Sequence, residues 1–528
     1  MRQWTMTTAA VVAMMAAAQP AMAQRAAIEE TSVAAVQADM TARRTTSERL
    51  TRAYLARIAA IDRKGPTLRS VIALNPQALE QARALDAERK AGRVRGPLHG
   101  VPVLVKDNIE TVENATTAGS LALKDNFTRR DAPLVTRLRA AGAVILGKTN
   151  LSEWANIRSS NSMSGWSAVG GLVRNPYALD RSSCGSSSGT GAAIAASLAV
   201  VGVGTETDGS VVCPAAMNGL VGLKPTIGLV SRTHVVPISH SQDTAGPMAR
   251  SVRDAAALFS AMIGSDSADA VTRDADRHRR DYAAALDASI VKGLRIGVLR
   301  PEMSSDLAAR FDASLALLKA QGAVLVDLKR PETEGMGAAE FDVLKMELKS
   351  DLNAYLATTP ASVKTRTLAD VIAFNQANAA AEMPFFAQEI FEQAQATGGV
   401  DDPKYKAARA KSLGLARAAI DGMLKASDVR LIVAPSYGAP WLSDPVHGDQ
   451  FSGPSASALP AISGYPHLTV PMGLVDGLPV GLSFFSTALT EGLLLNAGYA
   501  FEQAEPMRVA PGYAASANAG PGMDGAGR

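Results

Sequence analysis

Residues 204–210 read Gly204-Thr205-Glu206-Thr207-Asp208-Gly209-Ser210, and an apolar run from Ala192 to Val203 leads into them. The apolar run predicts a buried element that delivers the chain to this loop. A tight run of small and polar residues can aim consecutive backbone N–H groups at one point, where a negatively charged oxygen can develop. We therefore interpret Ser210 as a candidate nucleophile that lies in its own oxyanion hole.

The composition is that of a large globular protein. The chain has 528 residues, of which 47% are hydrophobic and 20% are charged, which is enough material for a large core. The formal net charge of +3 is small for this length, and no cluster of lysine and arginine interleaves with aromatic residues. These features argue against a nucleic-acid partner.

The first 23 residues have the pattern of a cleavable export signal. Arg2 supplies the positive charge, residues 7–18 form the apolar centre, and Ala21-Met22-Ala23 is a cleavage site before Gln24. This apolar run is too short to span a bilayer, and no later run reaches about 18 uninterrupted apolar residues. We expect a periplasmic or secreted protein without a membrane anchor.

Short apolar runs alternate with helical patterns from Gly100 onward. We expect buried strands at residues 101–105, 143–146, 200–203, 220–223, 295–299, 324–328, 431–434, 468–471 and 480–485. This alternation predicts an α/β fold with a large mixed sheet that helices cover on both faces.

The remaining segments define the domain organisation. Residues 27–92 have a helical pattern, with a helix start at Asn75-Pro76-Gln77. Residues 335–425 are helix-like and lie between two expected strands, so we predict a helical insertion or cap. Residues 511–528 are rich in Gly, Ala and Ser and predict a disordered tail. Residues 24–510 would then form a single domain.

The chain has two cysteines, Cys184 and Cys213, which flank the serine-rich loops. They can pair in an oxidising compartment, and buried free thiols are the alternative. Two cysteines are too few for a structural zinc site. The six histidines show no metal-ligand spacing; they are His99, His234, His240, His278, His447 and His467. We expect neither a metal nor an organic cofactor.

Two other motifs compete with Ser210. Residues 142–149 match the phosphate loop GxxxxGK[ST], but their four middle residues are Ala-Val-Ile-Leu. These predict a strand rather than the open turn that a phosphate needs. Residues 185–189 match the nucleophile elbow G-x-S-x-G around Ser187, but a turn-rich loop precedes them where an elbow needs a strand. We interpret both matches as structural.

Lys106 follows the apolar run 101–105 and precedes Asp107. Two interpretations stay open from the residues alone. The lysine can point to water or pair with Asp107, or it can be desolvated so that its pKa falls and the neutral amine acts as a base. Lys148 is a weaker candidate for such a base, and we expect Asp243 to be structural.

Five motifs together resemble the amidase signature family, and their order and spacing fit across residues 30–505. They are residues 100–108, 147–150, 184–189, 204–210 and 222–226. Within the family, residues 151–156, 205–210 and 241–248 are most similar to the bacterial peptide amidases, which hydrolyse the C-terminal amide of peptides.

The resemblance implies a Ser-Ser-Lys triad. Ser210 occupies the position of the nucleophile, Ser186 that of the bridging serine and Lys106 that of the base. The backbone N–H groups of Thr207, Asp208, Gly209 and Ser210 would form the oxyanion hole. Three residues depart from glycines that are common in the family, namely Cys184, Ser188 and Asp208. They bear on substrate specificity more than on mechanism.

We therefore predict a secreted serine hydrolase of carboxamides that releases ammonia from C-terminal peptide amides. An amidase for small aryl or aliphatic amides is the alternative with the same mechanism. Two alternatives belong to other classes: one of the chains of an aminoacyl-tRNA amidotransferase, which the export signal opposes, and a non-catalytic periplasmic binding protein. The amide substrate is the only partner that we expect, and we expect a monomer.

Overall fold

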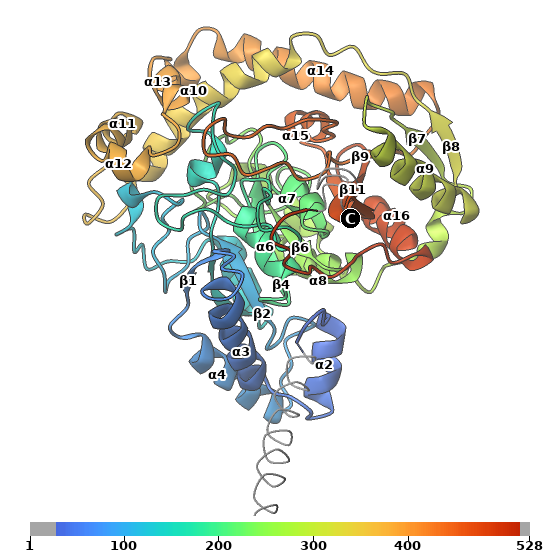
Figure 1. The fold of residues 1–528 in the computed structure, drawn as a ribbon, viewed down its shortest axis with the longest axis horizontal. Helices are drawn as coiled ribbons and strands as arrows, with labels where there is room; N and C mark the ends of the chain where they lie inside the picture. The colour runs from blue at the N-terminus through green and yellow to red at the C-terminus, as the bar shows by residue number, and fades with distance from the viewer. Residues whose placement is uncertain (1–27, 518–528) are drawn as a thin grey trace, which may run out of the picture.

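One mixed sheet organises the protein. The computed structural model describes residues 28–517 (Figure 1), so the predicted signal peptide lies outside the described residues. The sheet has 11 strands in the order β1-β3-β2-β4-β6-β5-β10-β11-β9-β7-β8. Their bounds are β1 Val71–Leu74, β2 Pro102–Lys106, β3 Val144–Thr149, β4 Val201–Glu206, β5 Val221–Lys224, β6 Thr244–Ala249, β7 Arg295–Val298, β8 Val324–Asp327, β9 Leu431–Pro435, β10 His467–Val475 and β11 Leu478–Phe485.

The described helices fill the segments between these strands. They are α2 Val33–Thr41, α3 Ser47–Arg57, α4 Ala78–Lys90, α5 Pro133–Ala140, α6 Ser188–Ala195, α7 Val212–Met217, α8 Val252–Met262, α9 Ser305–Ala320, α10 Met336–Ala357, α11 Leu368–Ala377, α12 Ala379–Glu382, α13 Glu389–Gln395, α14 Tyr405–Ala426, α15 Ala458–Ser463 and α16 Glu491–Ala504. Within residues 28–517, none of them is both long and apolar enough to cross a membrane.

Helices cover both faces of the sheet, as predicted. A side chain at Gly498 of α16 would meet Leu468 of β10, so α16 lies on the face to which Leu468 points. A side chain at Gly481 of β11 would meet Thr469 of β10 and Ala216 of α7. Because neighbouring residues of a strand point to opposite faces, α7 lies opposite α16. Helix α6 packs against α7, while α8 and α9 pack against α16.

All nine predicted apolar runs form strands, but two further strands escape prediction. Residues 71–74 fall in the segment predicted to be helical, yet they form β1, antiparallel to β3. An apolar run of four residues has no readable period, and pairing with β3 decides its conformation. Strand β6 contains Gly246 and Pro247, which are depleted in strands. A side chain at position 246 would lie 2.0 Å from the Leu223 carbonyl oxygen of β5, so only glycine fits there.

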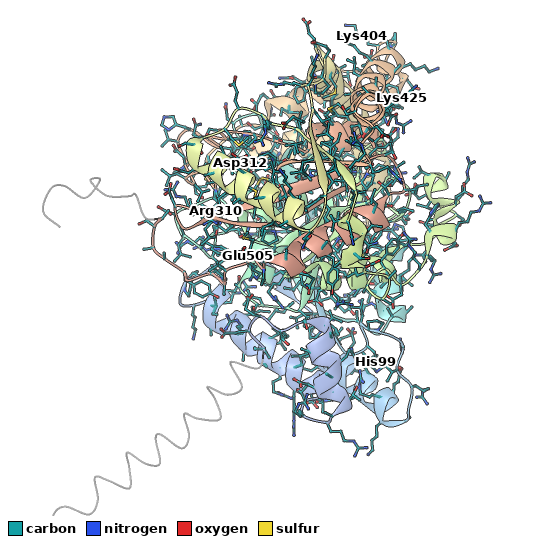
Figure 2. All side chains as sticks on the ribbon, turned by 90° about the vertical axis from the view of Figure 1, so that its right-hand side faces the viewer. His99, Arg310, Asp312, Lys404, Lys425 and Glu505 are labelled. Carbon is teal, nitrogen blue, oxygen red and sulfur yellow. A yellow bond between two sulfur atoms is a disulfide. The ribbon has the colours of Figure 1, made fainter. Side chains whose placement is uncertain are left out.

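The helices α10 to α14 connect β8 to β9 and cover residues 336–426, where the sequence predicted helices. They lie at the end of the molecule opposite α2, α3 and α4 (Figure 1). Figure 2 shows the same separation, since Lys404 and Lys425 of the α14 region lie far from His99. Helix α10 contacts both α13 and α14. Its role as a cap stays a prediction.

The ordered chain continues past the predicted start of the disordered tail at residue 511. Tyr513 N donates to the Pro176 carbonyl at 2.9 Å, and Leu179 N donates to the Ala514 carbonyl at 2.9 Å. Arg57 donates to the Tyr513 hydroxyl at 3.2 Å. Composition alone overlooks the anchoring contacts of a single tyrosine. Residues 518–528 lie outside the described residues.

Candidate active site

Lys106 is the last residue of β2 and is fully buried. Its Nζ donates to Ser186 Oγ at 2.7 Å and to Thr205 Oγ1 at 2.8 Å. Burial lowers the pKa of Lys106 to about 7, against the opposing effect of the Asp243 and Glu206 carboxylates. A large fraction of this amine is therefore uncharged at neutral pH, as a general base requires.

Asp107 pairs with Lys148 instead of Lys106. The distance from Lys148 Nζ to Asp107 Oδ1 is 2.8 Å, and both side chains are buried. The Thr117 amide donates to the other carboxylate oxygen at 3.2 Å, and so does the Thr117 hydroxyl. Lys106 thus neither points to water nor forms an ion pair with its neighbour. Of the two interpretations left open by the sequence, the structure supports the desolvated lysine.

Ser186 lies in the loop before α6 and is fully buried. Its carbonyl oxygen accepts a hydrogen bond from Ser152 N at 3.0 Å. A side chain at Gly185 would lie 2.2 Å from the Ser152 hydroxyl oxygen, so the loop needs glycine at that position. These contacts fix the backbone of Ser186 while its hydroxyl reaches Lys106.

Ser210 lies in the turn between β4 and α7, where its backbone contacts Ser187, the residue after Ser186. Its carbonyl oxygen accepts a hydrogen bond from Ser187 N at 3.2 Å, and the residue is 8% exposed. No hydrogen bond joins the Ser186 and Ser210 hydroxyls, both of which the structure describes. The structure therefore brings Lys106 and Ser186 together, and it joins Ser210 to the Ser186 loop through a backbone hydrogen bond.

The loop before α7 holds free backbone donors. Within residues 28–517, the N–H groups of residues 207–210 form no hydrogen bond. The next two N–H groups, of Val211 and Val212, donate to Glu206 Oε2 at 2.8 and 3.0 Å. The Glu206 carboxylate therefore fixes the end of the loop, and the four preceding donors remain available for an anionic oxygen.

A close contact between Gly209 and Tyr437 leaves no room for a side chain at the centre of this loop. Gly209 has a φ of +77°, in the left-handed region that glycine adopts without strain. A side chain there would lie 2.2 Å from the Tyr437 hydroxyl oxygen, and that hydroxyl donates to Ser457 Oγ at 2.7 Å. Position 209 therefore needs glycine both for its backbone conformation and for space.

Gln242 and Glu340, which lie outside the serine loops, support the loop. Gln242 Nε2 donates to Glu340 Oε1 of α10 at 2.8 Å and to the Thr207 carbonyl at 3.4 Å. Burial raises the pKa of Asp208, and burial together with the negative charge of Asp208 raises the pKa of Glu340 to about 8. No local sequence pattern connects α10 with the serine loop.

Asp243 is bound as a structural residue. Its Oδ2 accepts hydrogen bonds from Ile238 N at 2.8 Å and Ser239 N at 2.9 Å, and its Oδ1 accepts from Thr207 Oγ1 at 2.6 Å. Burial raises the pKa of Asp243 to about 6. The carboxylate therefore holds the segment 238–239 against the candidate oxyanion loop.

The two competing motifs are structural. Residues 144–149 form strand β3, and α5 precedes them, so the phosphate-loop match lacks an open turn. No strand directly precedes Ser187. The Ser187 hydroxyl donates to the Thr205 carbonyl at 3.1 Å and accepts from Thr205 N at 3.2 Å. Its hydrogen bonds therefore brace the end of β4.

Three side chains outside the serine loops could hold a metal ion, since the donor atoms of His240, Glu347 and Asp351 lie within 4.8 Å of one another. They already bind each other and their neighbours. His240 Nδ1 lies 2.9 Å from Asp351 Oδ2, and the Tyr405 hydroxyl donates to Glu347 Oε1 at 2.6 Å. This network ties the loop before β6 to α10, and that the protein needs no metal stays a prediction.

Known proteins are similar to this chain in fold and in sequence. The chain matches the amidase family over residues 49–495. A probable amidase of Arabidopsis thaliana is 38% identical over 522 residues, which cover 97% of each chain. The structure of native peptide amidase from Stenotrophomonas maltophilia is 51% identical with a TM-score of 0.88, over 92% of this chain and 99% of that chain. A glutamyl-tRNA(Gln) amidotransferase chain of Pseudomonas syringae pv. syringae is 36% identical over 479 residues, or 87% of this chain and 94% of that one. The chain therefore belongs to the amidase family, which confirms the predicted fold and the prediction of an amidase.

Proposed function

We propose that the protein hydrolyses carboxamides through Ser210, Ser186 and Lys106, and that its substrates are C-terminal amides of peptides. The observation that carries the mechanism is the 2.7 Å hydrogen bond between Lys106 Nζ and Ser186 Oγ in a fully buried site. The 51% identity with a peptide amidase supports the substrate class.

In the proposed reaction, Ser210 Oγ attacks the carboxamide carbon. Its proton passes to Ser186 Oγ while the Ser186 proton passes to Lys106 Nζ, because a hydroxyl can donate and accept at once. The N–H groups of residues 207–210 bind the resulting oxyanion. Lys106, now charged, returns the proton to the amide nitrogen through the same hydroxyl. The C–N bond breaks, ammonia leaves and the acyl group stays on Ser210.

Water then completes the cycle. It attacks the acyl carbon while Ser186 and Lys106 accept its proton, and the proton returns to Ser210 Oγ as the ester bond breaks. The products are the free peptide carboxylate and the original serine. In this scheme the protein's own side chains relay every proton, and its backbone amides donate the hydrogen bonds to the oxyanion.

The relay requires the Ser210 hydroxyl to face Ser186. Rotation about the Cα–Cβ bond of Ser210 moves Oγ between staggered positions without moving the backbone. Catalytic hydrogen bonds often tighten only when substrate binds. We propose that substrate binding selects the rotamer in which the two hydroxyls are hydrogen-bonded.

Ammonia release from a panel of peptide amides tests the proposal, with free peptides and small aryl and aliphatic amides as controls. Ser210→Ala should lower turnover by roughly 10⁴-fold or more while the melting temperature stays unchanged, because no other group replaces the nucleophile. Ser187→Ala is the matched control, since this neighbouring serine takes no part in the relay, and it should stay within about tenfold of wild type. Residual Ser210→Ala activity within tenfold of wild type would refute the assignment.

The relatives that belong to tRNA amidotransferases favour a second candidate function. An enzyme of that kind would release ammonia from glutamine and pass it to a tRNA-bound acceptor, leaving peptide amides intact. The higher identity with peptide amidase favours peptide amides. The same ammonia assay with free glutamine separates the two candidates.

We also propose export to the periplasm or the medium. The pattern of residues 1–23 supports it, and so does the disulfide between Cys184 and Cys213, because disulfides persist in oxidising compartments. N-terminal sequencing of the mature protein should begin at Gln24. A chain that keeps Met1 and stays in the cytosol would contradict this proposal.

A further inference from the structure

A disulfide joins the two loops that carry the candidate catalytic serines. Cys184 lies two residues before Ser186, and Cys213 lies three residues after Ser210. The two cysteines form a bond, and their Cα atoms are 6.0 Å apart. The sequence left their pairing open, and the structure places the bond beside the proposed proton relay.

Hydrogen bonds between the two loops lie on the other side of Ser186. Ser187 N donates to the Ser210 carbonyl at 3.2 Å, and the Ser187 hydroxyl bonds to the backbone of Thr205. The disulfide holds the segment before Ser186 at Cys184. Ser186 is therefore bracketed by hydrogen bonds at position 187 and by a covalent bond at position 184.

The backbone of Cys184 has a conformation that disfavours a side chain. Its φ is +54°, in the left-handed region where glycine has no steric penalty and other residues do. A cysteine in this conformation loses backbone stability that a glycine would keep. The bond to Cys213 accounts for a side chain at this position.

The disulfide also lies in the wall of the candidate oxyanion loop. Both cysteines are buried and pack with Val212, Met217 and Tyr437. The Tyr437 hydroxyl is the group that a side chain at Gly209 would meet. A shift of the disulfide would therefore displace the backbone N–H groups of residues 207–210 as well as Ser186.

We infer that the Cys184–Cys213 disulfide is a positioning element of the active site, which holds Ser186 in line with Ser210. Its loss lowers kcat and leaves the fold intact. This inference rests on the proposed function, because it assigns the bond to that relay. Displacement of a reacting group by about 1 Å can cost about 10²-fold, so we expect kcat to fall by roughly 10- to 100-fold with a much smaller change in KM.

Reduction of the folded protein provides the test without any substitution. Dithiothreitol supplies two electrons and two protons, which convert the disulfide to two thiols while the reagent closes to its own cyclic disulfide. Reoxidation with oxidised glutathione should restore the rate. A double variant, Cys184→Ala with Cys213→Ala, should have the low rate from the outset and should not respond to the reductant.

The readout is the rate constant for labelling of Ser210 by a fluorophosphonate, since this reagent reports on the nucleophile without an amide substrate. We compare the oxidised protein, the reduced protein, the double variant and Cys184→Gly. The glycine variant removes the bond but suits the local backbone, so an equal loss of rate in all three forms assigns the effect to the missing bond. Melting temperature and circular dichroism are measured in parallel.

Two results overturn the inference. One is a labelling rate in the reduced protein and in Cys184→Gly that stays within twofold of the oxidised protein. The other is a loss of rate that matches the unfolded fraction, because the bond would then serve only stability. Absence of label on Ser210 in the oxidised protein would instead overturn the proposed function, and this inference with it.

Discussion

Two neighbouring parallel strands, β2 and β3, carry buried lysines at the same edge of the sheet, and the two lysines have different partners. Lys106 Nζ binds the hydroxyls of Ser186 and Thr205. Lys148 Nζ binds the Asp107 carboxylate at 2.8 Å. Both lysines are buried and lie at the last or the last but one residue of a strand, so their roles differ because different groups bind each amine.

That difference gives the two lysine side chains different roles. A carboxylate favours the charged ammonium, whereas burial without a bonded carboxylate favours the neutral amine. Lys148 neutralises Asp107 and so stabilises the loop after β2. Among residues 28–517, Lys106 has only neutral hydrogen-bond partners, and its pKa falls to about 7, which suits it to accept a proton. Burial alone does not make a lysine a base; the absence of a bonded carboxylate is also required.

Of the changes that compare the two lysines, Lys106→Met should have the largest effect, which is on turnover. Methionine has a similar length and no proton-accepting amine, so the relay would lose its base. We expect kcat to fall by about 10²- to 10⁴-fold, the usual contribution of a general base. Ammonia release from a peptide amide measures it, and the melting temperature should not fall, because an apolar side chain suits the buried site.

Lys106→Arg provides the matched control for this prediction. Arginine keeps a positive charge but cannot lose its proton at any pH that the protein tolerates. It should therefore be as inactive as the methionine variant. Turnover by either variant within tenfold of wild type would show that another group is the base.

Lys148→Met should affect stability instead of chemistry. It leaves the buried Asp107 carboxylate without its counter-ion, and breaking one side of a buried ion pair typically costs about 3–5 kcal/mol. Urea denaturation measures the loss. Turnover per folded molecule should remain within about tenfold of wild type, because Lys148 does not contact Ser186.

The double variant Lys148→Met with Asp107→Asn is the control, since it removes both charges and should recover part of the lost stability. A Lys148→Met protein as stable as wild type would show that the ion pair contributes little. A Lys148→Met protein that is stable but inactive would show that the two lysines have been assigned the wrong way round.

Much of the fold is predictable from the sequence, because an apolar run and its spacing are properties of residues that are neighbours in the chain. Nine of the strands were read in this way. Strand β1 escaped because four apolar residues fit a helix or a strand equally well. Strand β6 escaped because Gly246 and Pro247 weaken the signal, and the need for glycine comes from β5, a different part of the chain.

Some residues of the candidate site are likewise predictable from local sequence, whereas its supporting contacts are not. Ser186 and Ser210 lie in motifs whose spacing is readable, and Lys106 lies at the end of an apolar run. The supporting contact from Gln242 to Glu340 joins a loop to the distant helix α10, and no periodicity in either segment announces it. The choice between Lys106 and Lys148 also depended on tertiary contacts, because both lysines are at strand ends.

The smallest expected effect is a shift in pH dependence, and it separates Lys106 from other groups that titrate nearby. Because the base must be neutral, kcat/KM should rise about tenfold per pH unit up to a midpoint near the Lys106 pKa of about 7 and level off above it.

Asp243→Asn should move this midpoint to lower pH, since the Asp243 carboxylate raises the pKa of Lys106. A hydrogen bond to Asp351 raises the pKa of His240, and His240→Gln is the control for a contribution from this histidine. A midpoint that follows His240→Gln and ignores Asp243→Asn would transfer the pH dependence to the histidine and leave Lys106, like Lys148, without a role as base.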